Sequence, residues 1–348
     1  MLFGIKKALS AAVTLVIAVA IGTATTTTSA IAADTFAGLR LQTLDISPTE
    51  KIDVALWYPT HTQSQSTTLG PHLLEVAMGA PASDGSHPLI VVSHGTGGMN
   101  LNHYELAAGL ARSGFVVAAL THPGDNYKDR SLLGAPAYFT ERPRQVSRML
   151  DALLADPTWK PLIDAERIGF LGHSAGGFTG AALIGATPSI NSTVRHCAAH
   201  YEEDVWFCKV SGSKDKAVEN ARNAEYIPVV PSSTDPRIKA AVLITPVGAF
   251  FPQASLQAVK VPVRVYVAGR DDVLIPKFHA AYVGQNIPGA EIININAGGH
   301  FMMVSKMNLA VTINGSEVNA DPPGFNRAPV IAEASKQLPL WFAKALAK

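Results

Sequence analysis

The chain has 348 residues, of which 47% are hydrophobic and 16% are charged, and its formal net charge is +1. Such a chain is too apolar to be disordered and long enough to bury one large core. The balanced charge, and the lack of a basic run interleaved with aromatic residues, argue against a nucleic-acid partner.

The N-terminal segment predicts an export signal over residues 1–32. Two lysines precede an apolar run at 8–21, and the small residues at 30–32 fit a signal-peptidase site. A membrane anchor is the alternative, but the run is shorter than the ~20 residues that a span requires. We therefore expect a mature chain of residues 33–348 that is periplasmic or secreted and has no stable membrane anchor.

The first elements after the signal are predicted to be strands. Residues 39–45 and 51–58 alternate apolar and polar side chains, which predicts two antiparallel strands. Residues 60–68 are expected to form a polar loop. Residues 71–87 are expected to be irregular, with one helical turn at 73–78.

From residue 88 onward, short apolar runs alternate with amphipathic segments. The apolar runs predict buried strands at 89–93, 115–120, around 168, 238–244, 261–268 and 291–295. The amphipathic segments predict helices at 102–113, 144–155, 276–285 and 328–347, with Pro143 at the start of the second. This alternation predicts an α/β fold class, with one domain and a mostly parallel central sheet flanked by helices.

Residues 188–236 interrupt the alternation and predict an insertion over the C-terminal edge of the sheet, either a lid or pocket wall or a plain surface loop. The segment holds the only two cysteines, Cys197 and Cys208, which we expect to form a disulfide in an oxidising compartment. A metal site is the alternative because His196 and His200 flank the first cysteine, although zinc ligands usually follow a more regular spacing. We predict no metal ion and no other cofactor.

The sequence Gly172-His173-Ser174-Ala175-Gly176 is a G-x-S-x-G motif between an apolar strand and a segment of small residues. In a nucleophile elbow the serine occupies a strained turn, and the glycines avoid collisions with neighbouring backbone. The alternatives are a tight turn with a surface serine and a phosphate-binding loop, and the second lacks the Gly-Lys-Ser/Thr ending. We predict that Ser174 is a nucleophile.

A serine nucleophile needs a histidine base and a carboxylate that orients the base, and in elbow enzymes the acid and then the histidine follow the serine. His300 follows two glycines after the last strand and is the expected base, whereas His279 lies in a helical pattern and is expected to face solvent. The acid should follow the strand at 261–268. Asp272 is preferred there by its spacing from the flanking glycine and proline, and Asp271 is the alternative.

Two backbone N–H groups are expected to bind the oxyanion. One belongs to Ala175, directly after the nucleophile, and the other to Thr96, in the glycine-rich loop after the strand at 89–93. His94 in the same loop is expected to have a structural hydrogen-bonding role. Three aromatic residues are candidates for an apolar acyl pocket, although such residues are more often core: Trp206, Phe250 and Phe251.

Five motifs occur in order along the chain: Ser-His-Gly-Thr-Gly-Gly at 93–98, Thr-His-Pro-Gly-Asp at 121–125, Glu-Arg-Pro at 141–143, Gly-His-Ser-Ala-Gly-Gly at 172–177 and Gly-His-Phe at 299–301. From about residue 39 to the C-terminus, the sequence resembles the dienelactone hydrolase-like α/β-hydrolases and is similar to the platelet-activating-factor acetylhydrolase branch. The resemblance implies an α/β-hydrolase fold. The chain departs from true dienelactone hydrolases, which use a cysteine nucleophile. It also lacks a carboxylate at 243–246, where the acetylhydrolases carry their acid, which favours Asp272 and argues against a phospholipid substrate.

The residues and the resemblance together predict an exported serine esterase that cleaves carboxylic esters, in small molecules or polymers, through an acyl-enzyme intermediate. An acyltransferase and a hydrolase of carbon–carbon bonds in diketones are alternatives that use the same side chains. A non-catalytic binding protein is disfavoured because no member of the expected triad is missing. The natural substrate and the oligomeric state are not predicted.

Overall fold

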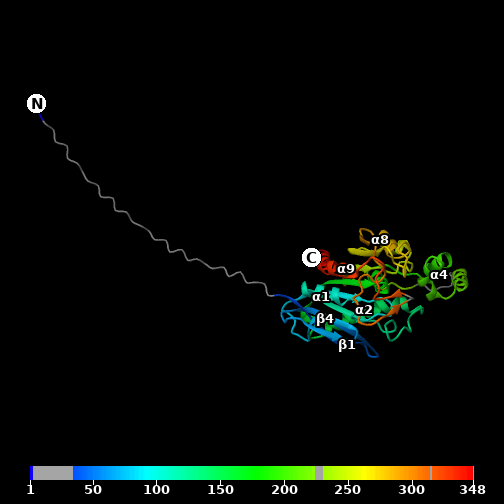
Figure 1. Cartoon of the computed structure of the whole chain (residues 1–348), viewed down its shortest axis with the longest axis horizontal. Helices are drawn as coiled ribbons and strands as arrows, with labels where there is room; N and C mark the ends of the chain where they lie inside the picture. Colours follow the sequence, from blue (N-terminus) through cyan, green and yellow to red (C-terminus); the bar gives the residue numbers. More distant parts are fainter. Residues whose placement is uncertain (3–33, 224–229, 314–315, 348) are drawn as a thin grey trace. The chain divides into compact units, whose positions relative to one another are not determined.

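A ten-stranded sheet in the order β10-β9-β8-β7-β5-β6-β2-β1-β4-β3 is the central feature of the computed structural model (Figure 1). The structure describes residues 1–2, 34–223, 230–313 and 316–347, so the predicted export signal lies outside the described residues. The strands of this sheet and of a separate pair, β11 and β12, are β1 (Phe36–Ser47), β2 (Glu50–Thr60), β3 (Gln65–Leu69), β4 (His72–Met78), β5 (His87–Ser93), β6 (Val116–Thr121), β7 (Ile163–His173), β8 (Ile238–Ile244), β9 (Val263–Ala268), β10 (Glu291–Ile295), β11 (Thr312–Ile313) and β12 (Ser316–Glu317).

Six neighbouring strands, from β6 to β10, pair in parallel, and β1 and β2 pair antiparallel as predicted. The carboxyl ends of parallel strands meet at one edge of a sheet, where α/β proteins place their sites. The loops after β5, β7, β9 and β10 meet at that edge and carry Thr96, Ser174, Asp271 and His300. The predicted mostly parallel α/β sheet is confirmed.

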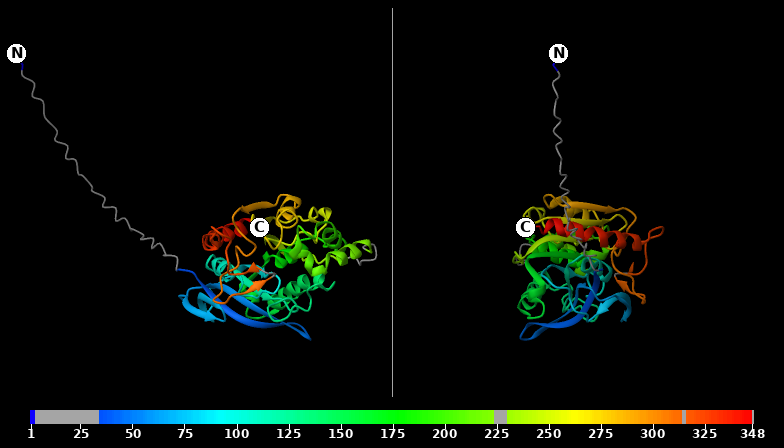
Figure 2. Two further views of the ribbon diagram at one scale, coloured as in Figure 1. Left: turned by 45° about the vertical axis from the view of Figure 1, so that its right-hand side comes forward. Right: turned by 90° about the vertical axis from the view of Figure 1, so that its left-hand side faces the viewer.

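Helices cover both faces of the sheet (Figure 2). Side chains alternate along β5, so that Ile90 packs in one apolar cluster with Leu106 and the helix α9, and Val91 packs in the other with Met149 and Phe178. The helices are α1 (Tyr104–Arg112), α2 (Tyr138–Ala155), α3 (Ala175–Leu183), α4 (Ile190–His200), α5 (Val205–Cys208), α6 (Lys214–Arg222), α7 (Gln253–Leu256), α8 (Ala280–Asn286), α9 (Arg327–Ala345) and the 3₁₀ helices η1 (Lys160–Leu162) and η2 (Lys209–Ser211).

The hairpin of β3 and β4 occupies residues for which a loop and a helical turn were predicted, and that prediction is wrong. His72, Leu74 and Val76 are buried whereas Leu73 and Glu75 are exposed, a period of two that belongs to a strand. The two strands pair antiparallel, and β4 pairs with β1 in parallel, which extends the sheet at this edge.

The helix α2 begins at Tyr138 rather than at residue 144, so Pro143 lies inside the helix and not at its start. The buried side chains of Tyr138, Phe139 and Arg142 hold these first turns against the core. Proline removes a helical donor, but packing of the residues around it can outweigh that loss.

The segment predicted as an insertion folds into α4, α5 and α6 between α3 and β8. Ile190, Val194 and Phe207 from this segment line the same cavity as Ser174, so the segment forms part of a pocket wall. Its residues 224–229 lie outside the described part of the chain. No helix among the described residues is long and apolar enough to span a bilayer.

Candidate active site

Ser174 stands on the turn between β7 and α3 with a φ of 56° and a ψ of −116°. Such a positive φ strains a non-glycine residue and aims its side chain out of the strand-to-helix turn. A Cβ on Gly176 would lie 2.0 Å from the carbonyl oxygen of Ser93, and one on Gly172 would lie 2.1 Å from that of Gly176. Both glycines are therefore required for the strand and the helix to approach this closely.

The imidazole of His300 connects Ser174 to a buried carboxylate. Its Nε2 lies 2.9 Å from the Ser174 Oγ, and its Nδ1 lies 2.8 Å from Oδ2 of Asp271. The hydroxyl, the imidazole and the carboxylate are almost completely buried, with Asp271 5% and His300 3% exposed. This is the order and spacing in which a carboxylate orients an imidazole that accepts a serine proton.

The carboxylate in this arrangement belongs to Asp271. The sequence favoured Asp272 and left Asp271 as the alternative, and the preference for Asp272 is wrong. The turn after β9 buries the side chain of Asp271 and leaves that of Asp272 exposed. Oδ1 of Asp271 accepts hydrogen bonds from the backbone N–H groups of Val273 and Leu274, at 3.0 and 2.7 Å. These bonds fix the carboxylate so that its other oxygen faces the imidazole.

The backbone of His300 is held by two side chains. Nε2 of His173 donates a hydrogen bond to the His300 carbonyl at 3.0 Å, and the Thr245 hydroxyl donates to the same oxygen at 3.4 Å. Burial holds the pKa of His173 well below its usual range, so this imidazole is neutral. Because a carbonyl oxygen can only accept, the single proton of the ring is on Nε2. His173, which precedes Ser174, therefore positions the loop that carries His300.

The glycine-rich loop after β5 is fixed by a buried ion pair that the sequence analysis did not assign. Nη1 of Arg142 donates to Oδ2 of Asp125 at 2.6 Å, and both side chains are fully buried. Oδ1 of Asp125 accepts from the Gly97 N–H at 3.0 Å. His94 has the structural role expected of it, because its Nε2 accepts from the His122 N–H at 3.0 Å.

With the site in place, comparisons with known proteins identify the family. Residues 82–311 match the model of the alpha/beta hydrolase family. The chain belongs to this family. The hydrolase is similar in structure to a ferulic acid esterase from Streptomyces cinnamoneus, with 19% identity, a TM-score of 0.59 and 91% of each chain covered.

A second structural neighbour is a dienelactone hydrolase-like promiscuous phosphotriesterase from metagenomic libraries, with 12% identity and a TM-score of 0.52. The match covers 90% of the present hydrolase and 100% of that chain. A comparison with curated proteins found no match. At these identities the two neighbours support the fold, and the predicted α/β-hydrolase fold is confirmed.

A cavity of about 680 Å³ opens onto Ser174 and His300 in this hydrolase. Two of the three aromatic residues predicted for an apolar pocket, Trp206 and Phe250, line it. Phe251 is 2% exposed and packs against Phe178 in the core, so its predicted place in the pocket is wrong. The described lining is mainly apolar, with contributions that include Leu133, Phe139, Ile190, Val194, Phe207, Val247, Leu274, Phe301 and Val318.

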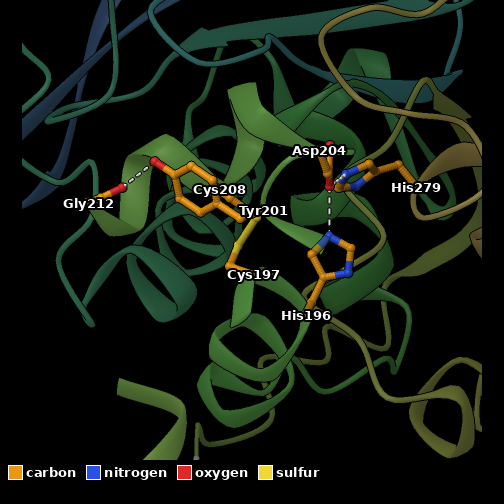
Figure 3. The surroundings of a disulfide bond; sticks show 7 residues. All are labelled: His196, Cys197, Tyr201, Asp204, Cys208, Gly212 and His279. Atoms are coloured by element: carbon orange, nitrogen blue, oxygen red, sulfur yellow. Dashed lines mark hydrogen bonds and ion pairs between the residues drawn. A yellow bond between two sulfur atoms is a disulfide. The ribbon is translucent and has the colours of Figure 1, made fainter. Parts of the chain in front are cut away.

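The disulfide predicted between Cys197 and Cys208 is present and joins α4 to α5 (Figure 3). Beside it, Oδ2 of Asp204 accepts hydrogen bonds from Nε2 of His196 at 2.8 Å and from Nε2 of His279 at 2.7 Å. His279 is fully buried, so the expectation that it faces solvent is wrong. The ligand atoms of His196, Asp204 and Cys208 lie within 4.8 Å of one another, but the sulfur is bonded to Cys197 and is no thiolate ligand.

The carboxylate of Asp204 is charged in this cluster. Burial opposes its ionisation, but the hydrogen bonds from His196 and His279 outweigh that cost and lower the pKa of Asp204 to about 2. His279 Nδ1 also accepts from the Gly248 N–H at 3.1 Å, in the loop after β8. The cluster therefore links the helices of the pocket wall to the body of the hydrolase.

Proposed function

We propose that the protein is an exported serine hydrolase that cleaves carboxylic esters through an acyl-enzyme intermediate. The observation that supports this most is the continuous chain of hydrogen bonds from Ser174 through His300 to Asp271, with the hydroxyl at the edge of a large cavity. The predicted export signal at 1–32 and the disulfide support an extracytoplasmic location.

Each residue has a distinct task in this reaction. Nε2 of His300 removes the proton from Ser174 as its oxygen attacks the ester carbonyl, and Asp271 stabilises the resulting imidazolium. The imidazolium then protonates the leaving alcohol. The N–H groups of Ala175 and Thr96 stabilise the tetrahedral oxyanion, and water activated by His300 releases the acid.

The cavity favours an uncharged ester with an apolar acyl group. None of the described lining residues is Asp, Glu, Lys or Arg, so a charged acyl group would lose its hydration without an ionic partner. Each methylene that enters an apolar pocket contributes about 0.8 kcal/mol, which corresponds to a rise of about fourfold in kcat/KM until the cavity is filled.

The test is turnover of p-nitrophenyl esters from acetate to palmitate, with labelling by a fluorophosphonate. We expect hydrolysis and labelling of the wild-type protein, loss of both in Ser174→Ala, and no loss in Ser66→Ala, a change at an exposed serine of β3. A ferulate ester belongs in the panel because one structural neighbour is a ferulic acid esterase. Turnover that persists in Ser174→Ala contradicts the proposal.

The two alternatives are separated by product analysis. An acyltransferase would convert an added acceptor alcohol into a new ester faster than it releases free acid, because the alcohol competes with water for the same acyl-enzyme. A carbon–carbon hydrolase would cleave diketones in preference to every ester in the panel.

A further inference from the structure

The two proposed oxyanion donors belong to segments that are distant in the sequence. The Thr96 N–H lies in the loop after β5, and the Ala175 N–H begins α3. Donors stabilise an oxyanion only where both are held within hydrogen-bonding distance of the same oxygen. Some group must therefore set the position of the loop relative to the helix, and Arg142 from α2 makes hydrogen bonds to both.

On the loop side, Arg142 holds the backbone on each side of Thr96. Its Nη2 donates to the His94 carbonyl oxygen at 2.5 Å. Its Nη1 donates to Asp125, whose other oxygen accepts the Gly97 N–H at 3.0 Å. The carbonyl two residues before Thr96 and the N–H one residue after it are thus both tied to one ion pair.

On the helix side, Nε of Arg142 donates to the Thr179 hydroxyl oxygen at 3.0 Å. That hydroxyl in turn donates to the Ala175 carbonyl oxygen at 2.9 Å, in the first turn of α3. One planar guanidinium therefore connects the segments of both donors, and its rigid fork of N–H groups fixes their separation better than a flexible ammonium would.

We propose that Arg142 and Asp125 are a positioning pair that sets the geometry of the oxyanion site. The inference rests on the proposed function. Neither residue is among those that line the cavity, and both are fully buried, so they act through Thr96 and Ala175 and not on the substrate itself. A pair with only a structural role would affect the stability of the fold and leave turnover per folded molecule unchanged.

The experiment compares Arg142→Lys and Asp125→Asn with wild-type protein in steady-state kinetics. We expect kcat to fall about a hundredfold in each, because a displacement of about 1 Å at a reacting centre has this effect, while KM changes by less than about threefold. Affinity for an alkyl boronic acid, whose adduct places an oxygen in the oxyanion site, should fall by a similar factor. The double variant should lose little more than either single variant, because both changes release the same loop.

The matched control is Asp235→Asn, which disrupts an ion pair of Asp235 with Arg237 at 2.6 Å. This pair also contacts α2, because Arg237 donates a hydrogen bond to the carbonyl oxygen of Ser147. This change should lower the melting temperature and leave kcat unaltered. Thr179→Val removes only the helix side of the connection and should lower kcat by less than the roughly hundredfold expected of Arg142→Lys, because the loop side keeps its hydrogen bonds. This variant tests the inference even if Arg142→Lys does not fold. Folded Arg142→Lys, Asp125→Asn or Thr179→Val with wild-type kcat would overturn the inference while the esterase itself stands. Absence of ester turnover in wild-type protein would instead overturn the proposed function.

Discussion

Replacing Asp271 by asparagine should move the proton of the His300 imidazole from Nδ1 to Nε2. Oδ1 of Asp271 accepts two backbone N–H groups, so the amide oxygen of the asparagine must occupy that place and its NH₂ group must face Nδ1 of His300. Nδ1 then has to accept a hydrogen bond, and the imidazole proton moves to Nε2. An Nε2–H cannot remove the proton from Ser174, because its lone pair is occupied.

The expected fall in kcat follows from the loss of the nitrogen that accepts the proton of Ser174. An aspartate-to-asparagine change that leaves geometry intact and selects the wrong tautomer lowers kcat by about 10⁴, or about 5 kcal/mol of activation free energy. The fold should be retained because the asparagine keeps both backbone hydrogen bonds. KM should change little, since Asp271 is not among the residues that line the cavity.

The assay is kcat for a p-nitrophenyl ester in Asp271→Asn and in the matched control Asp272→Asn, with melting temperatures measured in parallel. The control should retain kcat within about threefold, because a change at an exposed position usually shifts free energies by about 0.5 kcal/mol or less. If Asp271→Asn keeps a tenth or more of the wild-type kcat, or if Asp272→Asn loses as much as Asp271→Asn, the tautomer argument is wrong.

Three further changes test other parts of the structure. The first change replaces both Cys197 and Cys208, which are 11 residues apart, by serine. Loss of the disulfide should lower the stability of the pocket wall by about 2–3 kcal/mol and should speed limited proteolysis between residues 188 and 223. An unchanged rate of proteolysis would contradict this. Asp204 has a folded pKa of about 2, below its unfolded value, so its stabilising contribution is present above about pH 4 and is lost as the pH falls to about 2. The difference in the free energy of unfolding between wild type and Asp204→Asn, measured by denaturation, should therefore shrink by about 2 kcal/mol over that pH range. A constant difference would refute the low pKa of Asp204. Gly176→Ala should lower the free energy of unfolding by at least about 3 kcal/mol, because the new Cβ would lie 2.0 Å from the carbonyl oxygen of Ser93. A soluble variant with the wild-type melting temperature would disprove this close approach.

The parallel core of the fold could be predicted because its signals are local. Continuous apolar runs gave the strands β5 to β10, and the small residues around Ser174 gave the elbow. The hairpin of β3 and β4 was missed because His72, Leu74 and Val76 are interrupted by the apolar but exposed Leu73, which obscures the period of two. Whether such a segment is a strand depends on a partner strand, and β1 is distant in sequence.

The candidate site likewise contains residues that local sequence predicts and residues that only the tertiary structure identifies. Ser174 and His300 follow from motif and order, whereas the choice between Asp271 and Asp272 depends on which side chain the turn after β9 directs inward. His279 could not be assigned from its helical pattern, because its partner Asp204 lies in another segment.

The amino-acid sequence by itself determined the strand-and-helix alternation, the strained turn at Ser174 and the spacing of the cysteines, since each depends on residues that are close neighbours. Only the tertiary structure decided which aspartate lies against His300, the buried contacts of Arg142 with Asp125 and Thr179, and the burial of Phe251 away from the cavity. These depend on where distant segments meet, and a side chain's hydrogen-bond partners and burial are properties of that meeting and not of its own stretch of chain.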